Sequence, residues 1–169
     1  GVGRLKVSPD FYRGKRVLVT GHTGFKGMWL SLLLLQAGAE VTGYALDVPT
    51  EGGAEALQRL GILTEMRDIR GDVRDLSALS RAFDEAKPEI VLHLAAQPIV
   101  RESYRQPVDT FAANVMGTVN LLECVRMSDT VQSALVVTTD KVYENREWVW
   151  GYRENEPLMG YDPYAASKS

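Results

Sequence analysis

The sequence predicts an α/β fold in which helices cover both faces of a parallel sheet. Short apolar runs typical of strands alternate with stretches of helical length throughout the 169 residues. The first of these runs, at residues 17–20, leads through a turn with three glycines into an apolar stretch at residues 28–37. Because no internal repeat or low-complexity segment breaks this alternation, we expect a doubly wound parallel sheet.

The glycine-rich turn reads Gly21-x-x-Gly24-x-x-Gly27. Gly21 permits a tight turn, Gly24 lets the backbone approach a pyrophosphate, and Gly27 lets the helix pack closely on the strand. The first amides of the following helix have no intrahelical partner, and the helix dipole places partial positive charge there. The pattern therefore predicts a Rossmann-type nucleotide-binding turn; the alternative is a glycine-rich connection that binds nothing.

A second strand is expected at residues 40–46, after the helix-stopping Gly38. In a dinucleotide-binding unit the residue ending this strand selects between a ribose hydroxyl and a 2′-phosphate, and a carboxylate there favours NAD. Asp47 is the nearest acid, two residues beyond the usual position, which Ala45 occupies. We therefore expect NAD, without excluding NADP, and the alternative for Asp47 is a solvated turn acid.

The rest of the chain continues the alternation of strands and helices. We expect a loop with a short helix at 49–61, broken by Gly52 and Gly53; a third strand within 65–73; a helix at 75–86; a fourth strand at 87–96; a polar loop at 97–106; a long helix at 107–127; and a fifth strand at 133–139. Asp75 or Ser77 is expected to cap the helix at 75–86. The fourth strand is apolar enough to be buried on both faces.

Three residues in these elements each allow two interpretations. Asp72 ends the third strand, at the sheet edge where ligands of such folds bind, and the alternative is a capping role. His93 lies inside the fourth strand, and we expect a core histidine rather than a ligand. Cys124 lies in the amphipathic 107–127 segment, so we expect a buried structural thiol rather than a nucleophile.

Composition limits the classes of partner. The net charge is −3 with acidic and basic residues interspersed, so neither a nucleic-acid-binding stripe nor a cationic membrane-surface helix is expected. The apolar run at residues 28–35 is too short to cross a bilayer. A single cysteine excludes an intrachain disulfide and fits a reducing compartment, so we expect a cytoplasmic protein with small-molecule partners and no metal site.

A polar and aromatic loop is expected between residues 140 and 163. A loop of this length without periodicity usually serves as a lid or binding loop. Trp148 and Trp150 are interpreted as lid residues that shield the site, with packing of a surface loop as the alternative. Pro163 is then expected to open a last helix at residues 164–168.

Tyr164 and Lys168 form the candidate catalytic pair. Their spacing of four residues places both side chains on one face of a helix. A lysine ammonium beside a phenol stabilises the phenolate, which can then take a proton from a sugar hydroxyl while hydride leaves the same carbon for nicotinamide. The spacing is common by itself, and its weight comes from the glycine turn and the alternating strands that precede it.

Several motifs resemble the extended short-chain dehydrogenase/reductase family of nucleotide-sugar enzymes. They are the glycine turn, Gly71-Asp-Val-Arg-Asp75, His93-Leu-Ala-Ala96, Asn114-Val-Met-Gly-Thr118 and Tyr164-x-x-x-Lys168. Within that family, the glycine turn and the segment from Thr138 to Tyr152 resemble the group of 4,6-dehydratases that act on CDP-glucose. The resemblance covers about residues 11–169.

The resemblance implies a role for each candidate catalytic residue. Tyr164 would be the base for the sugar C4 hydroxyl, Lys168 would tune it and hold the nicotinamide ribose, and Thr139 would hydrogen-bond the same hydroxyl. Asp140 would protonate the departing C6 hydroxyl. Lys141 would remove the C5 proton, where dehydratases acting on dTDP-glucose carry a glutamate; the alternative is an exposed loop lysine.

The resemblance also implies a cofactor site and a reaction. The residues expected to hold NAD are Gly21, Thr23, Gly24, Phe25, Lys26, Gly27, Asp72, Val73, Leu94, Ala95, Ala96, Gln97, Asn114, Thr138, Tyr164 and Lys168. CDP-glucose would be oxidised at C4, lose water across C5 and C6, and take the hydride back at C6, giving CDP-4-keto-6-deoxyglucose. The alternatives are another nucleotide-sugar dehydratase or epimerase, and a non-catalytic dinucleotide-binding fragment.

The family's fold continues for nearly as many residues again, which complete the sheet and add a small nucleotide-sugar domain. We therefore expect residues 1–169 to form an incomplete NAD-binding Rossmann domain, truncated before the last strands. The family further implies a homo-oligomer, a dimer or tetramer, assembled through the helix at 107–127.

Overall fold

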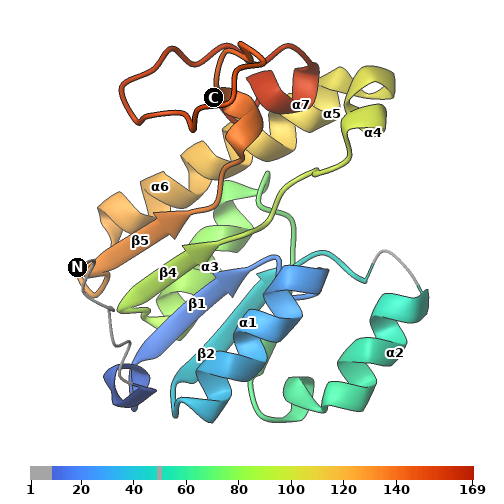
Figure 1. The fold of residues 1–169 in the computed structure, drawn as a ribbon. Coiled ribbons are helices and arrows are strands. Elements are labelled where there is room, and N and C mark those ends of the chain that lie inside the picture. Colours follow the sequence, from blue (N-terminus) through green and yellow to red (C-terminus); the bar gives the residue numbers. More distant parts are fainter. Residues whose placement is uncertain (1–8, 49–50) are drawn as a thin grey trace.

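The chain folds around one parallel sheet with helices on both faces (Figure 1). The computed structural model describes residues 9–48 and 51–169. The strands are β1 (Arg16–Thr20), β2 (Glu40–Ala45), β3 (Arg67–Arg70), β4 (Ile90–His93) and β5 (Ser133–Val136). They lie in the order β3-β2-β1-β4-β5, all parallel, so the predicted doubly wound sheet is confirmed.

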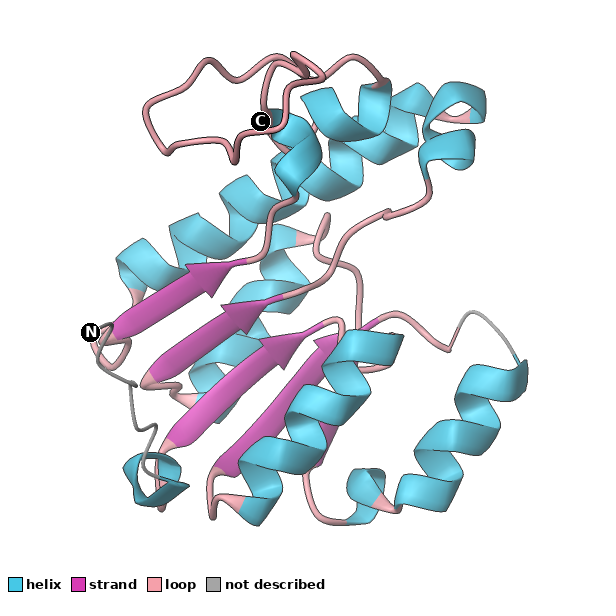
Figure 2. Cartoon of the chain, in the orientation of Figure 1, coloured by secondary structure: helices cyan, strands magenta, loops and turns pink. Residues whose placement is uncertain are grey.

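The helices follow the strands in alternation (Figure 2). They are η1 (Pro9–Tyr12), α1 (Phe25–Gln36), α2 (Glu51–Leu60), η2 (Ile62–Thr64), α3 (Leu76–Ala86), α4 (Val100–Arg105), α5 (Pro107–Phe111), the π-helical turn η3 (Ala112–Met116), α6 (Gly117–Met127), η4 (Asp140–Val142) and α7 (Pro163–Ala166). Within these described ranges, no helix has the length and apolar character needed to cross a membrane.

Two apolar layers hold the helices on the sheet. On one face, Val17 and Val19 of β1 pack with residues of α1 and α2. On the other face, Leu18 of β1 packs with residues of α3 and α6, including Leu79 and Leu121. Successive side chains of a strand point to opposite faces, so β1 is buried on both sides, as parallel sheets require.

The predictions for two of the helices were wrong in detail. Helix α1 begins at Phe25 rather than at residue 28, because the extended backbone of Gly24 forms its N-cap. Helix α2 runs through Gly52 and Gly53 without a break, and residues 49 and 50 of the predicted loop segment lie outside the described residues. Glycines cost little in this first turn, where the apolar face formed by later residues packs against α1.

The predicted polar loop at 97–106 contains the short helix α4. Its polar sequence has no apolar periodicity, and its turn is held by local bonds such as Ser103 Oγ to the Val100 carbonyl at 2.7 Å. The predicted long helix at 107–127 is confirmed as α5, η3 and α6 in succession. At its π-helical turn Thr118 donates to the Asn114 carbonyl at 2.6 Å, which gives that carbonyl a side-chain partner.

His93 is the predicted core histidine, and it is fully buried. Thr20 Oγ1 accepts hydrogen bonds from the Leu94 and Ala95 amides at 3.2 Å each, so its own proton points to His93 Nδ1, 2.6 Å away. His93 Nε2 then donates to Thr118 at 3.2 Å. This directed chain assigns the neutral tautomer protonated at Nε2 and ties the Leu94 segment to α6.

Burial and the charge of Lys168 lower the pKa of His93 from its ordinary 6.5 to about 4. Above pH 6.5 the imidazole is neutral whether the chain is folded or unfolded, whereas between 6.5 and 4 only the unfolded chain takes up the proton. We therefore expect the free energy of unfolding to fall by about 3 kcal/mol over this interval on account of His93. Urea denaturation of wild type and His93→Gln at several pH values measures it; equal pH slopes would contradict it.

The other predicted buried group, Cys124, is also confirmed. Its side chain packs in the layer between the sheet and α6, and burial raises the pKa of its thiol. A buried thiol held in its protonated form is a poor nucleophile, so Cys124 has a structural role.

Candidate functional site

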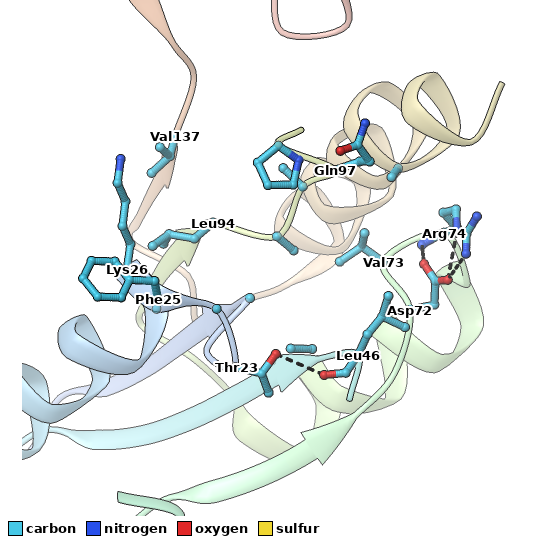
Figure 3. Close-up of a pocket in the computed structure, with 18 of the residues that line it drawn as sticks. Thr23, Phe25, Lys26, Leu46, Asp72, Val73, Arg74, Leu94, Gln97 and Val137 are labelled. Carbon is cyan, nitrogen blue, oxygen red and sulfur yellow. Dashed lines mark hydrogen bonds and ion pairs between the residues drawn. The ribbon is translucent and has the colours of Figure 1, made fainter. Parts of the chain in front are cut away.

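A cavity of about 740 Å³ lies along the carboxyl ends of the strands. Figure 3 shows Phe25 and Lys26 on one side of it and Arg74 on the other. Of the predicted cofactor-binding residues, all except Asn114 line this cavity. The turn after β1, the turn after β3 and the segments after β4 and β5 thus meet at the sheet edge where ligands of doubly wound folds bind.

The glycine turn forms one wall of the cavity. Gly21 has a positive φ of 76°, and a Cβ there would lie 2.7 Å from the Ala95 amide nitrogen. A Cβ at Gly27 would lie 2.7 Å from the His22 Cα and collide with the Gly21 carbonyl oxygen. Both positions therefore require glycine, one for the turn itself and the other for the close approach of α1 to it.

The amino end of α1 faces the cavity. Gly24 is the N-cap and has no side chain to satisfy the first amides of this 12-residue helix. The first turn contains no acidic residue, and Lys26 lies within it. Helix dipole, free amides and a lysine together make this wall suited to an anion such as a pyrophosphate.

Asp72 and Arg74 form the opposite wall. Asp72 accepts hydrogen bonds from Arg74 at its amide, Nε and Nη2, at 2.9, 2.8 and 2.6 Å. These bonds hold the pKa of Asp72 below its ordinary value. Arg74 also reaches Asp109 on α5 at 3.4 Å. Sequence analysis did not single out Arg74, although its place in the Gly71-Asp-Val-Arg-Asp75 motif was the available signal.

Asp72 does not cap α3. Asp75 does so, accepting from the Ala78 amide at 2.9 Å, which confirms the first of the two predicted caps. Asp72 therefore belongs to the cavity wall, with its carboxylate fully engaged by Arg74.

Asn114 lies behind the cavity rather than in it. Its side chain is buried; Oδ1 accepts from the Gln97 amide at 2.8 Å, and Nδ2 donates to the Gln97 carbonyl at 3.1 Å and to Ser167 Oγ at 2.8 Å. One amide thus joins the loop after β4 to the helix that carries Tyr164. Asn114 positions cavity-lining segments without lining the cavity itself.

Tyr164 and Lys168 both line the cavity, although the predicted helix over residues 164–168 ends at Ala166. Helix α7 starts at Pro163, and its N-cap Asp162 accepts from the Ala165 amide at 2.9 Å. Lys168 lies just beyond the helix end, where its ammonium donates to the Val137 carbonyl at 3.2 Å. Burial lowers the pKa of Lys168.

The predicted residues Thr139, Asp140 and Lys141 form one turn after β5 that packs against α7. Thr139 Oγ1 donates to Asp140 at 3.1 Å and accepts from the Lys141 amide at 3.4 Å. Asp140 and Lys141 are exposed, and none of the three lines the cavity, whereas the neighbouring Thr138 does. They directly follow Thr138, on a turn that packs against the helix that carries Tyr164.

The loop from 140 to 163 is closed on itself by a bridge between Tyr143 and Leu158. Tyr152 stacks on Tyr143 with ring centroids 5.1 Å apart and lies 6.0 Å from Trp148. Trp148 and Trp150 are exposed and do not line the cavity, so this structure does not show them shielding the site. Their role as lid residues stays a prediction.

The strand order, the glycine turn and the helix end at the cavity define a Rossmann-type nucleotide-binding domain. The chain belongs to the family described as GDP-mannose 4,6 dehydratase, which matches residues 18–169. A CDP-glucose 4,6-dehydratase of Salmonella typhimurium is 56% identical over 96% of this chain and 45% of its own length. A dTDP-glucose 4,6-dehydratase of Xanthomonas campestris is 34% identical over 90% and 45%.

Solved structures agree with this assignment of the fold. UDP-glucose 4-epimerase of Thermus thermophilus in complex with NAD is 33% identical, with a TM-score of 0.77 over 90% of this chain and 47% of its own. The corresponding epimerase of Brucella ovis with NAD is 27% identical, with a TM-score of 0.77. The chain spans about half the length of the relatives that it matches.

Proposed function

We propose that this chain is the cofactor-binding part of an NAD-dependent CDP-glucose 4,6-dehydratase. The observation that carries the proposal is that Tyr164 and Lys168 face the same cavity as the phosphate-binding end of α1. The choice of CDP-glucose is supported by the 56% identity to a dehydratase of that name, against 34% for one acting on dTDP-glucose.

The cavity suits a dinucleotide. The glycine turn lets the amides of α1 lie at the cavity wall, because side chains at Gly21 and Gly27 would collide with the backbone of Ala95 and of the turn itself. Lys168 is held by the Val137 carbonyl in the segment after β5, in reach of a nicotinamide ribose in the proposed site. Bound NAD supplies the hydride acceptor for C4 and the hydride donor for C6 of the sugar.

In the proposed reaction the side chains move protons. Tyr164 takes the proton of the C4 hydroxyl, with Lys168 stabilising the phenolate and Thr139 orienting the hydroxyl. Asp140 donates a proton to the departing C6 hydroxyl, and Lys141 removes the C5 proton. The position of the last three on one turn beside α7 supports this division of roles.

The test of the dehydratase assignment is Lys141→Met. We expect formation of the 4-keto-6-deoxy product to fall by about 100-fold or more, because general-base assistance to C5 deprotonation is lost. Oxidation at C4 should persist, so NADH should accumulate on the enzyme when CDP-glucose is added. Lys15→Met, at the amino end of β1 and paired with Glu89, is the matched control.

Wild-type turnover by Lys141→Met would contradict the role of Lys141. An epimerase needs only Tyr164 and the cofactor. If the wild-type protein interconverts sugar epimers without loss of water, the epimerase alternative is favoured. A panel of CDP-, dTDP-, GDP- and UDP-glucose separates the dehydratases from one another. A protein that binds NAD but turns over none of them would be a dinucleotide-binding fragment.

Three further parts of the proposal concern the whole protein. We assign binding of the nucleotide sugar to a second domain of the whole protein, as the resemblance implies. A location in the reducing cytoplasm is supported by the single cysteine of the chain, which is a buried thiol. A homo-oligomer is supported by exposed apolar side chains on one face of α5 to α6, namely Val108, Phe111, Val115, Val119 and Leu122. Sedimentation of the intact protein as a monomer would contradict assembly through this face.

A further inference from the structure

Helix α6 holds the turn after β3 from behind. The Asn120 side chain donates through Nδ2 to the Val73 carbonyl and to the Arg74 carbonyl, at 3.0 Å each. Both partners are acceptors, which assigns the amide nitrogen, and both of its N–H groups are used. One turn earlier on α6, Gly117 permits this close approach, because a Cβ there would lie 2.6 Å from Val73 Cγ2. Asn120 and Gly117 together fix the position of the turn.

The bonds of Asn120 act on the cavity wall through one peptide group. Val73 and Arg74 both line the cavity, whereas Asn120 does not. The peptide between Val73 and Arg74 is trans, so its carbonyl and its amide point in opposite directions. The carbonyl is directed at Asn120, and the amide donates to Asp72 Oδ1 at 2.9 Å. Asn120 therefore helps to fix the Asp72 carboxylate without touching it.

The other bonds of this wall do not replace that support. Arg74 donates to Asp72 Oδ2 from Nε and Nη2, as Figure 3 shows, but its side chain is half-exposed. An ion pair with access to solvent contributes little to stability. The Tyr44 hydroxyl donates to the Asp72 carbonyl at 3.0 Å and so holds the backbone at the start of the turn. The end of the turn, at Val73 and Arg74, is held by Asn120.

The Asp72 wall lies on the adenosine side of the proposed ligand. In a doubly wound fold the pyrophosphate lies at the first helix, and the ribose of the adenosine lies at the end of the second strand. Tyr164 and Lys168 come after β5, on the other side of β1 from β2 and β3. The nicotinamide is then on the β5 side, and Asp72, in the turn after β3, faces the adenosine.

We propose that Asn120 is a positioning residue for the adenosine half of the dinucleotide. It fixes the peptide between Val73 and Arg74 and thereby holds the Asp72 carboxylate in the cavity wall. The inference rests on the proposed function, because it assumes that the cavity binds a dinucleotide. Loss of the Asn120 amide should therefore weaken binding through the adenosine half and leave the contacts of the nicotinamide unchanged.

The test measures dissociation constants of NAD and ADP-ribose by calorimetric titration of the intact protein. ADP-ribose carries the adenosine half and the pyrophosphate and lacks the nicotinamide. Asn120→Ala should weaken both ligands by the same factor, about tenfold, because the two hydrogen bonds that fix the turn are lost. Arg126→Gln, on the same helix and in an exposed pair with Glu123, is the matched control and should keep the wild-type values.

Asn120→Asp separates hydrogen bonding from a loss of structure. At about pH 8 its carboxylate cannot donate and faces two carbonyl oxygens, so both ligands should be weakened at least as much as in Asn120→Ala. As the pH falls to about 5, the carboxyl takes up a proton and donates one bond, so about threefold of the affinity relative to wild type should return. Asn120→Ala should show no such recovery. The charged groups around the turn, Asp72, Arg74, Asp75 and Asp109, are common to all the variants.

Each outcome decides one part of the inference. Unchanged affinity for ADP-ribose in Asn120→Ala overturns it and leaves the proposed function intact, since wild type still binds NAD. A loss of affinity for NAD alone overturns the assignment to the adenosine half. An Asn120→Asp variant that follows Asn120→Ala at every pH overturns the role of the hydrogen bonds. A wild type that binds neither ligand contradicts the proposed function and this inference together.

Discussion

Replacement of Tyr164 by phenylalanine should reduce turnover of CDP-glucose by about a thousandfold. The change removes the one hydroxyl on α7 that faces the cavity as the proposed base for the C4 proton, while leaving the ring in place. Dinucleotide affinity should change by less than about threefold, because the α1 amides proposed to bind the phosphates are untouched. Product formation and NADH titration measure the two quantities separately.

Tyr161→Phe is the matched control for this change. Tyr161 lies in the same segment, but its side chain is exposed and does not line the cavity. It should therefore keep wild-type turnover. An equal loss of turnover in both variants would mean that the loop is disturbed and that Tyr164 has no chemical role. Wild-type turnover by Tyr164→Phe would likewise exclude Tyr164 as the base.

Gly27→Ala should cost about 3 kcal/mol of stability and abolish dinucleotide binding. The added Cβ meets the His22 Cα at 2.7 Å and the Gly21 backbone, none of which can move without displacing the turn proposed to bind phosphate. Chemical denaturation and NADH titration of the same preparation check both effects.

Gly52→Ala is the control for glycine replacement as such. Gly52 lies in α2, and a Cβ there meets nothing within 4 Å. Alanine should therefore be neutral or stabilise the protein by about 0.5 kcal/mol. Wild-type stability and binding in Gly27→Ala would show that α1 can move away from the turn, and the close approach would then have no functional meaning.

Local signals in the chain were sufficient to predict the sheet and the wall formed by α1. Strands buried on both faces leave uninterrupted apolar runs, as at Val17 to Thr20, and the strained turn at Gly21 admits few other residues. Helix boundaries were less certain, because Gly24 caps α1 through its backbone conformation and leaves no side-chain signal. Helix α4 lacks the apolar periodicity by which helices are recognised.

The motifs predicted most of the cavity lining, but they did not distinguish residues that line the cavity from residues that position them. Asn114 stands in such a motif, yet it acts through Gln97 and Ser167, contacts that depend on how three separate segments pack. Asp47 and Arg70, whose side chains lie 3.7 Å apart, are 23 residues apart in sequence and meet only because β2 and β3 are neighbours. Tertiary pairing of this kind has no local sequence pattern.

The most direct test of the proposed reaction is the fate of the hydrogen on C4 of the sugar. The intact protein would be supplied with CDP-glucose carrying deuterium at C4, and the product would be analysed by mass spectrometry and NMR. The proposal predicts a 4-keto-6-deoxy product with one deuterium at C6, because the hydrogen leaves and returns within a single cavity. A product without deuterium at C6, or unchanged substrate, would contradict it.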